Sequence, residues 1–169
     1  CDRASELGTV QICNYNCPGQ LVIGGEQAAV EKAGALAKEL GAKRCMPLKV
    51  SGPFHTRLMK PAGDALAMYF KTISFGPMEF PVCFNCKGGP LEEGESIPAL
   101  LERQVQSPVY WEDTIRRMEA DGIDTVVEIG PGKALSGFFK KTAPAIQTYS
   151  IDTAAGFHRV VAALKGEHA

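Results

Sequence analysis

The stretch TVQICNYNCPGQLVIGG, residues 9–25, begins the architecture that the rest of the chain continues. Residues 9–14 alternate and are rich in β-forming side chains, and residues 21–25 form a second short apolar run, so each predicts a strand. Residues 16–20 between them contain Asn, Pro and Gly, which are typical of turns. The stretch therefore predicts a β-hairpin.

A helix is expected directly after this hairpin. Apolar residues recur at helical spacing through residues 26–40, and Gly41 supplies a stop. Residues 45–50 then predict a third strand, and residues 2–7 predict the last turns of a helix whose beginning is missing. We therefore expect residues 1–50 to form a ferredoxin-like small subdomain that lacks its first strand, in a chain that begins inside a larger protein.

Helices and strands alternate beyond residue 50. Thr56 can cap a helix, and Pro61 indicates that this helix is either kinked or begins later. Further helices are expected at about 96–106, 110–121 and 133–141 and near the end of the chain, with strands at 80–86, 124–129 and 146–151. This alternation is typical of an α/β fold with a partly parallel sheet. We assign residues 51–169 to a second α/β subdomain.

Composition and charge exclude several classes of protein. The 169 residues are 45% hydrophobic and 22% charged, with a net charge of −1, as in ordinary globular proteins. Lys and Arg are scattered, which argues against nucleic acid as a partner. No apolar run approaches the roughly 20 residues needed to cross a bilayer, and no signal peptide is present. We expect a soluble, cytoplasmic protein without a membrane partner.

Six cysteines raise the question of a metal site. Cys83 and Cys86 have C-x-x-C spacing, but on an extended strand residues three apart point to opposite faces. A zinc site would also need a second pair of ligands, for which Cys13 and Cys17 are the candidates. We expect reduced thiols and no metal. The alternative is a zinc-binding module built on these four cysteines, which metal analysis would test.

The stretch SGPFHT, residues 51–56, contains the strongest candidate for catalysis. His55 follows a predicted strand and a Gly-Pro turn, which places it at a sheet edge where active sites of α/β folds tend to lie. An imidazole titrates near neutral pH, so it can take a proton from a hydroxyl nucleophile and return it. The alternative is a turn histidine that only hydrogen-bonds its neighbours.

Two further patterns bear on chemistry. Gly130, Pro131 and Gly132 stand between a predicted strand and a predicted helix, so they form either a tight turn or a cradle for a phosphate. The G-x-S-x-G turn that presents a nucleophilic serine occurs nowhere in the 169 residues. His55 therefore has no evident serine partner in this chain.

Four segments in register resemble one family, the malonyl-CoA:acyl carrier protein transacylases. They are residues 14–25, 41–62, 103–111 and 127–137. The resemblance implies the C-terminal portion of a type II fatty acid synthesis enzyme, with part of an α/β-hydrolase-like subdomain beside the ferredoxin-like one. It implies a ping-pong acyl transfer through a Ser-His pair.

The resemblance also implies roles for particular residues. His55 is the general base and acid, and the main-chain carbonyl of Gln104 orients it, in place of the Asp of a triad. Asn14, Gln20 and Phe54 are expected to contact substrate. No cofactor is implied, because the coenzyme A thioester is a substrate. Malonyl-CoA and acyl carrier protein are the implied partners, with a missing N-terminal half that carries the serine, so the isolated chain is predicted to be inactive.

Two alternatives remain beside this interpretation. The chain could come from an acyltransferase domain of a polyketide or fatty acid synthase, which performs the same chemistry. It could also be a non-catalytic module that binds acyl carrier protein, and tight carrier binding without acylation of a serine would favour that.

Overall fold

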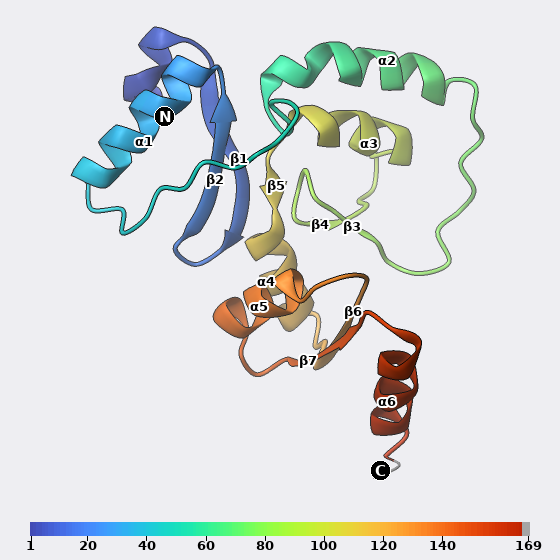
Figure 1. The fold of residues 1–169 in the computed structure, drawn as a ribbon. Coiled ribbons are helices and arrows are strands. Elements are labelled where there is room, and N and C mark those ends of the chain that lie inside the picture. The colour runs from blue at the N-terminus through green and yellow to red at the C-terminus, as the bar shows by residue number, and fades with distance from the viewer. Residues whose placement is uncertain (167–169) are drawn as a thin grey trace.

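A computed structural model gives the fold of the chain, and the description covers residues 1–166 (Figure 1). It is a mixed α/β structure, as predicted. Three small sheets carry the strands, in the orders β2-β1-β5, β3-β4 and β6-β7. The hairpin and its helix lie on one side, a pair of helices lies beside them, and the C-terminal elements lie below in the view of Figure 1.

The predicted hairpin is confirmed. Strands β1 (Val10–Cys17) and β2 (Gln20–Gly25) pair antiparallel across the Pro18–Gly19 turn. Gly19 has a φ of 75°, a conformation that glycine adopts without steric cost. Both strands reach further into the expected turn region than the sequence indicated, and β1 carries two register irregularities.

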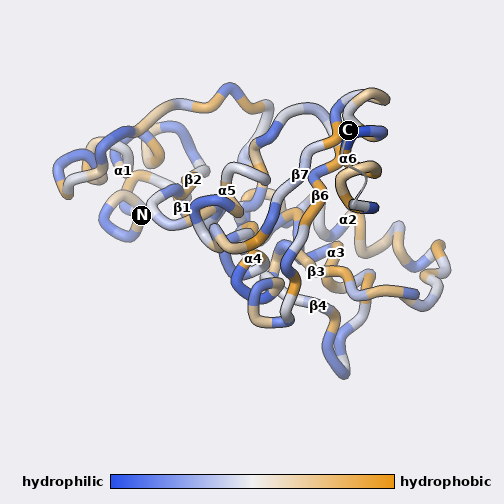
Figure 2. The backbone as a smooth tube through the Cα atoms, turned by 90° about the horizontal axis from the view of Figure 1, so that it is seen from below, coloured by the Kyte–Doolittle hydropathy of each residue, from blue (hydrophilic) through white to orange (hydrophobic). Residues whose placement is uncertain are grey.

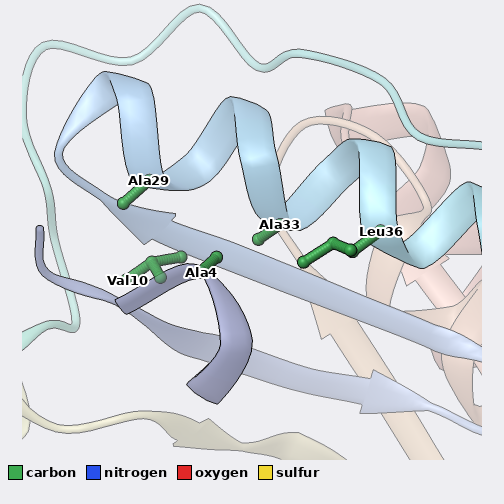
Figure 3. Close-up of a cluster of buried hydrophobic side chains, with 5 residues drawn as sticks. All are labelled: Ala4, Val10, Ala29, Ala33 and Leu36. Atoms are coloured by element: carbon green, nitrogen blue, oxygen red, sulfur yellow. The ribbon is translucent and has the colours of Figure 1, made fainter. Parts of the chain in front are cut away.

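The helix expected after the hairpin is also confirmed, as α1 (Gln27–Glu39). It packs with β1 and with η1 (Asp2–Leu7), a 3₁₀ helix at the position of the expected helix end. Their contact is a small apolar core, shown in Figure 3, made of Ala4, Val10, Ala29, Ala33 and Leu36. The alanines let the helix approach the strands closely, because no long side chain separates the backbones.

The prediction of a strand at residues 45–50 is wrong. These residues form neither helix nor strand, and residues 46–50 are exposed. An alternating sequence becomes a strand only where a neighbouring strand takes up its backbone hydrogen bonds. Within residues 1–166 no strand pairs with this segment, and β2 stays at the edge of its sheet. The β-β-α-β pattern is therefore incomplete here, and the ferredoxin-like description and the boundary at residue 50 stay predictions.

Helices α2 (Lys60–Phe70) and α3 (Ile97–Gln106) lie side by side after this segment (Figure 1). Thr56 caps the short 3₁₀ helix η2 (Arg57–Met59), and α2 begins only at Lys60. Pro61 thus falls in the first turn of α2, where its missing N–H has no consequence. Of the two possibilities that Pro61 left open, the later start is confirmed.

The strand predicted at residues 80–86 is much shorter in the structure. Only β3 (Cys83–Phe84) forms, paired antiparallel with β4 (Gly89–Pro90). Pro81 cannot donate a backbone hydrogen bond, which shortens any ladder through it. After α3, the two-residue strand β5 (Val109–Tyr110) pairs parallel with β1, so it ties the helix pair to the hairpin.

The C-terminal elements follow the predicted alternation. They are α4 (Trp111–Ala120), β6 (Thr125–Ile129), α5 (Ala134–Thr142), β7 (Gln147–Ile151) and α6 (Ala154–Leu164). Strands β6 and β7 pair in parallel along five residues, with α5 as the crossover. Figure 2 shows the hydrophobic run of β6. Ile115, Phe139, Ala143 and Ile146 form the core between α4, α5 and the start of β7. No helix within residues 1–166 has the length and apolar character required of a membrane span.

Candidate active site

His55 lies in the turn that precedes η2, in an uncommon backbone conformation. Its φ is +62°, and it is the one non-glycine residue with a positive φ in the described part of the chain. Side chains with a Cβ rarely adopt this left-handed conformation because it crowds the following carbonyl. Such residues persist only where surrounding contacts hold them, and they cluster at functional sites.

Two of these contacts come from the last turn of α3. The backbone N–H of His55 donates to the main-chain oxygen of Val105 over 3.1 Å. The ring Nδ1 lies 3.1 Å from the main-chain oxygen of Gln104. A carbonyl oxygen can only accept, so this contact requires the proton on Nδ1 and leaves the Nε2 lone pair free. The structure therefore brings together His55 and Gln104, the two residues predicted to be catalytic.

The end of α3 explains why these carbonyls are free. The last four carbonyl groups of an α-helix have no partner inside the helix. Residues before a proline avoid the helical conformation, and Ser107, before Pro108, is extended with φ −119° and ψ 155°. The helix thus stops at Gln106, and the carbonyls of Gln104 and Val105 accept from His55 instead.

A second anchor joins the histidine turn to the hairpin. The backbone N–H of Arg57 donates to Oε1 of Gln11 on β1 over 3.0 Å. The guanidinium of Arg57 donates from Nη2 and Nε to Oγ1 of Thr9, over 3.1 and 3.3 Å. His55 is therefore held between the C-terminal end of α3 and strand β1.

The other predicted site residues take different positions. Asn14 lies on β1 opposite Val109, the first residue of β5. Gln20 opens β2 beside the hairpin turn, and its Oε1 accepts from the Sγ of Cys17 at 3.8 Å. Phe54 is 45% exposed, which leaves its ring open to a ligand beside His55. The roles of Asn14, Gln20 and Phe54 in binding substrate stay predictions.

The glycine turn after β6 is closed by a carboxylate. Glu128 accepts from the backbone N–H groups of Leu135 and Ser136, over 3.1 and 2.8 Å, and from the Ser136 hydroxyl over 2.6 Å. Burial raises the pKa of this carboxyl, but the three hydrogen bonds outweigh that effect and lower it below its ordinary value. Since Glu128 already fills the N-terminus of α5, the tight-turn interpretation is favoured over the phosphate cradle.

The cysteines occupy two separate parts of the fold. Cys13 and Cys17 are buried on β1, whereas Cys83 and Cys86 lie on and after β3, where Cys86 donates to the main-chain oxygen of Leu100 at 3.4 Å. All six thiols are free. Within residues 1–166 no group of three or more His, Cys, Asp or Glu side chains is arranged to hold a metal ion.

A cationic cleft of about 450 Å³ lies between α5, β7 and α6. Lys133, Lys140 and Arg159 line it together with small hydroxyl side chains, so it can attract an anion. No sequence motif predicts this cleft, because its cations are spread over 27 residues (133 to 159 inclusive).

The chain is similar to known proteins along almost its whole length. No model of a protein family matches the chain. A curated malonyl CoA-acyl carrier protein transacylase of Haemophilus influenzae is 42% identical over 160 residues, which cover 95% of this chain and 51% of that protein. The chain belongs to the malonyl CoA-acyl carrier protein transacylase family. It spans about half the length of the curated transacylases it matches, which fits a C-terminal portion.

Solved transacylase structures share the fold described above. The Clostridium perfringens transacylase has a TM-score of 0.93 and 38% identity, and the match covers 98% of this chain and 52% of that one. A second malonyl-transacylase, solved in complex with its type II polyketide acyl carrier protein, has a TM-score of 0.91 and 38% identity. That match covers 98% of this chain and 53% of the solved one.

Proposed function

We propose that His55 is the general base and acid of a malonyl transfer from coenzyme A to the phosphopantetheine thiol of acyl carrier protein. The observation that carries the proposal is the 3.1 Å contact between Nδ1 of His55 and the main-chain oxygen of Gln104. It fixes the tautomer whose Nε2 can accept a proton. The kinship with malonyl CoA-acyl carrier protein transacylases supplies the substrates.

The chemistry proceeds in two balanced half-reactions. Nε2 of His55 takes the proton of a serine hydroxyl while the serine oxygen attacks the thioester carbonyl of malonyl-CoA. The tetrahedral intermediate collapses, the C–S bond breaks, and the sulfur of coenzyme A leaves with the proton that His55 returns. The phosphopantetheine thiol then attacks the resulting malonyl ester. His55 takes the proton of the thiol and returns it to the serine oxygen, which is the leaving group of this half-reaction.

The C-terminal end of α3 supports the cationic state of this cycle. His55 becomes an imidazolium after it takes the proton. The partial negative charge at the end of a helix and the carbonyl of Gln104 both favour a cation there. A carbonyl thus does the work that a carboxylate does in a Ser-His-Asp triad, which is to fix the tautomer and stabilise the imidazolium.

The serine is proposed to lie in the half of the transacylase that this chain does not cover. The chain has no G-x-S-x-G turn, and it matches 51% of the Haemophilus influenzae relative. The same half is proposed to supply the group that pairs with the malonyl carboxylate. On this view residues 1–50 belong to a ferredoxin-like subdomain and the remainder to an α/β-hydrolase-like one, the isolated chain is inactive, and the location is cytoplasmic.

A chimera tests the proposal. The half of the Haemophilus influenzae transacylase outside the match is joined to this chain, and transfer of labelled malonyl from coenzyme A to carrier protein is measured. The chimera should transfer malonyl, whereas His55→Ala should reduce the rate by about 10²–10⁴-fold. An equally active His55→Ala chimera would refute the role of His55. Transfer by the isolated chain would refute the location of the serine.

The type of carrier is a separate question. One of the solved malonyl-transacylases was determined in complex with a type II polyketide acyl carrier protein. Parallel assays of the chimera with a fatty acid carrier and a type II polyketide carrier distinguish the two. We expect the higher kcat/KM with the fatty acid carrier. Tight carrier binding without any malonyl-serine ester would instead favour a module that only binds the carrier.

A further inference from the structure

Thr56, the residue after His55, is a buried polar side chain with two hydrogen bonds. It has 0% exposure. Its hydroxyl donates to the main-chain oxygen of Pro53 over 2.6 Å and accepts from the backbone N–H of Leu58 over 3.3 Å. A buried hydroxyl needs such partners to offset the loss of water. Here both partners are backbone groups, one on each side of His55.

The same side chain packs against the hairpin. Its Cγ2 atom lies 3.5 Å from the position that a Cβ would take at Gly24 on β2. The methyl of Thr56 therefore reaches β2 at ordinary contact distance, whereas the Sγ of Cys13, 2.6 Å from the same position, occupies most of the space beside Gly24. The hydroxyl of Thr56 thus holds the histidine turn by its two hydrogen bonds, and the methyl adds only a van der Waals contact with the sheet.

This arrangement acts on the conformation of His55. The bond from Thr56 to Pro53 spans His55 and closes the turn around its φ of +62°. Without that closure the backbone would relax toward the more favourable negative φ values. The relaxation would turn the ring away from the carbonyl of Gln104, and the two nitrogens would then compete for the proton.

We propose that Thr56 is the positioning residue of His55, whose hydroxyl holds the turn so that Nδ1 donates to Gln104 and Nε2 stays free. The inference rests on the proposed role of His55 as the base. The effect of Thr56 on the His55 ring can be tested independently of that role, because the tautomer can be measured without any reaction.

The experiment is ¹⁵N NMR of the histidine ring in the 169-residue chain at a pH where the imidazole is neutral. The wild-type chain should show His55 in the Nδ1–H form. Thr56→Val keeps the shape but removes the hydroxyl, and should lower the ratio of Nδ1–H to Nε2–H by about 2- to 12-fold, the range that corresponds to one hydrogen bond. Thr56→Ser should restore the wild-type ratio.

Thr72→Val is the matched control. The Thr72 hydroxyl also donates three residues back, to the main-chain oxygen of Tyr69 over 2.7 Å, but in the exposed turn that follows α2. Thr72→Val should leave the ratio of Nδ1–H to Nε2–H in the His55 ring unchanged. An unchanged tautomer ratio in a folded Thr56→Val chain, or a failure of Thr56→Ser to restore it, overturns the inference. If Thr56→Val does not fold, Thr56→Ala removes the hydroxyl with a smaller side chain and replaces it in the test. Independently of any variant, a wild-type chain whose His55 ring is in the Nε2–H form overturns the inference.

Activity of the chimera separates this inference from the proposed function. Thr56→Val should lower kcat with an unchanged KM, and Thr56→Ser should recover it. If Thr56 had only a structural role, Thr56→Val would reduce the amount of folded enzyme and leave kcat per folded molecule unchanged. That result would overturn the inference. An inactive wild-type chimera with the expected change of tautomer would contradict the proposed function and leave the positioning role of Thr56 in place.

Discussion

The ring of His55 is held by the main chain of Gln104, and the side chain of Gln104 takes no part in that contact. The identity of the residue at position 104 should therefore matter little as long as α3 ends at the same place. Gln104→Ala keeps the carbonyl and favours the helix. In the chimera it should change kcat/KM by less than about threefold, the usual effect of a substitution away from buried contacts. A loss as large as that of His55→Ala would show that the side chain is required.

The pH dependence of stability should reveal the carboxylate that closes the glycine turn. The pKa of Glu128 is lower in the folded chain than in the unfolded one. The carboxylate therefore stabilises the fold fully above the unfolded pKa of about 4.3, and this contribution is lost as the pH falls through the lower folded value. Glu128→Gln should reduce the free energy of unfolding at pH 7, and the difference from wild type should shrink below pH 4. Urea unfolding at several pH values measures both.

A control separates this effect from the general loss of a negative charge. Glu79→Gln removes a carboxylate from an exposed position in the segment before β3. It should leave the free energy of unfolding nearly unchanged at both pH values. A Glu128→Gln deficit that stays constant from pH 7 to pH 3 would contradict the proposed cause.

Local pattern was sufficient to predict most of the elements. The hairpin, α1, α3, α4 and the β6-α5-β7 unit all have strong periodicity and clear stop residues, and each appears in the structure. The failures are segments whose form depends on distant partners. Residues 45–50 have the alternation of a strand, but alternation does not supply the neighbouring strand that would accept their hydrogen bonds.

The same division holds for the candidate site. His55 could be found from its Gly-Pro turn, and the family resemblance pointed to Gln104. Thr56 could be found as a cap, but the left-handed backbone of His55 and its bonds to Gln104 and Val105 leave no signal in the sequence. They arise where the turn meets the end of α3, 49 residues away from His55 along the chain. Sequence spacing does not report such tertiary contacts.

Thiol reactivity should follow burial. Burial raises the pKa of Cys13 to about 11, and it also raises the pKa of Cys17 and Cys86, so each has little of the reactive thiolate. Cys1 is exposed. With a soluble disulfide reagent at pH 8, Cys1 should react first, and the three buried thiols should react only as fast as the chain opens. Mass spectrometry of peptides at successive times measures the order, and early labelling of Cys13 would contradict the packing of β1.

Gly25 should be among the least tolerant positions of the hairpin. It ends β2 opposite Val10 with a φ of +150°, and an added Cβ would lie 2.0 Å from the main-chain oxygen of Thr9. That oxygen also accepts the backbone N–H of Glu26 over 2.7 Å, so it cannot move without breaking the start of α1. Gly25→Ala should lower the free energy of unfolding by at least about 1–3 kcal/mol, the range for a disfavoured backbone conformation.

Gly34 offers the opposite case in the helix that follows the hairpin. It lies inside α1, and an added Cβ there would meet nothing within 4 Å. Gly34→Ala should therefore raise the free energy of unfolding by about 0.5–1 kcal/mol, because alanine loses less backbone entropy in a helix. Urea denaturation of both variants gives the comparison. If both variants changed the free energy of unfolding equally and in the same direction, the close approach of β2 to Thr9 would not be the reason that glycine is needed at position 25.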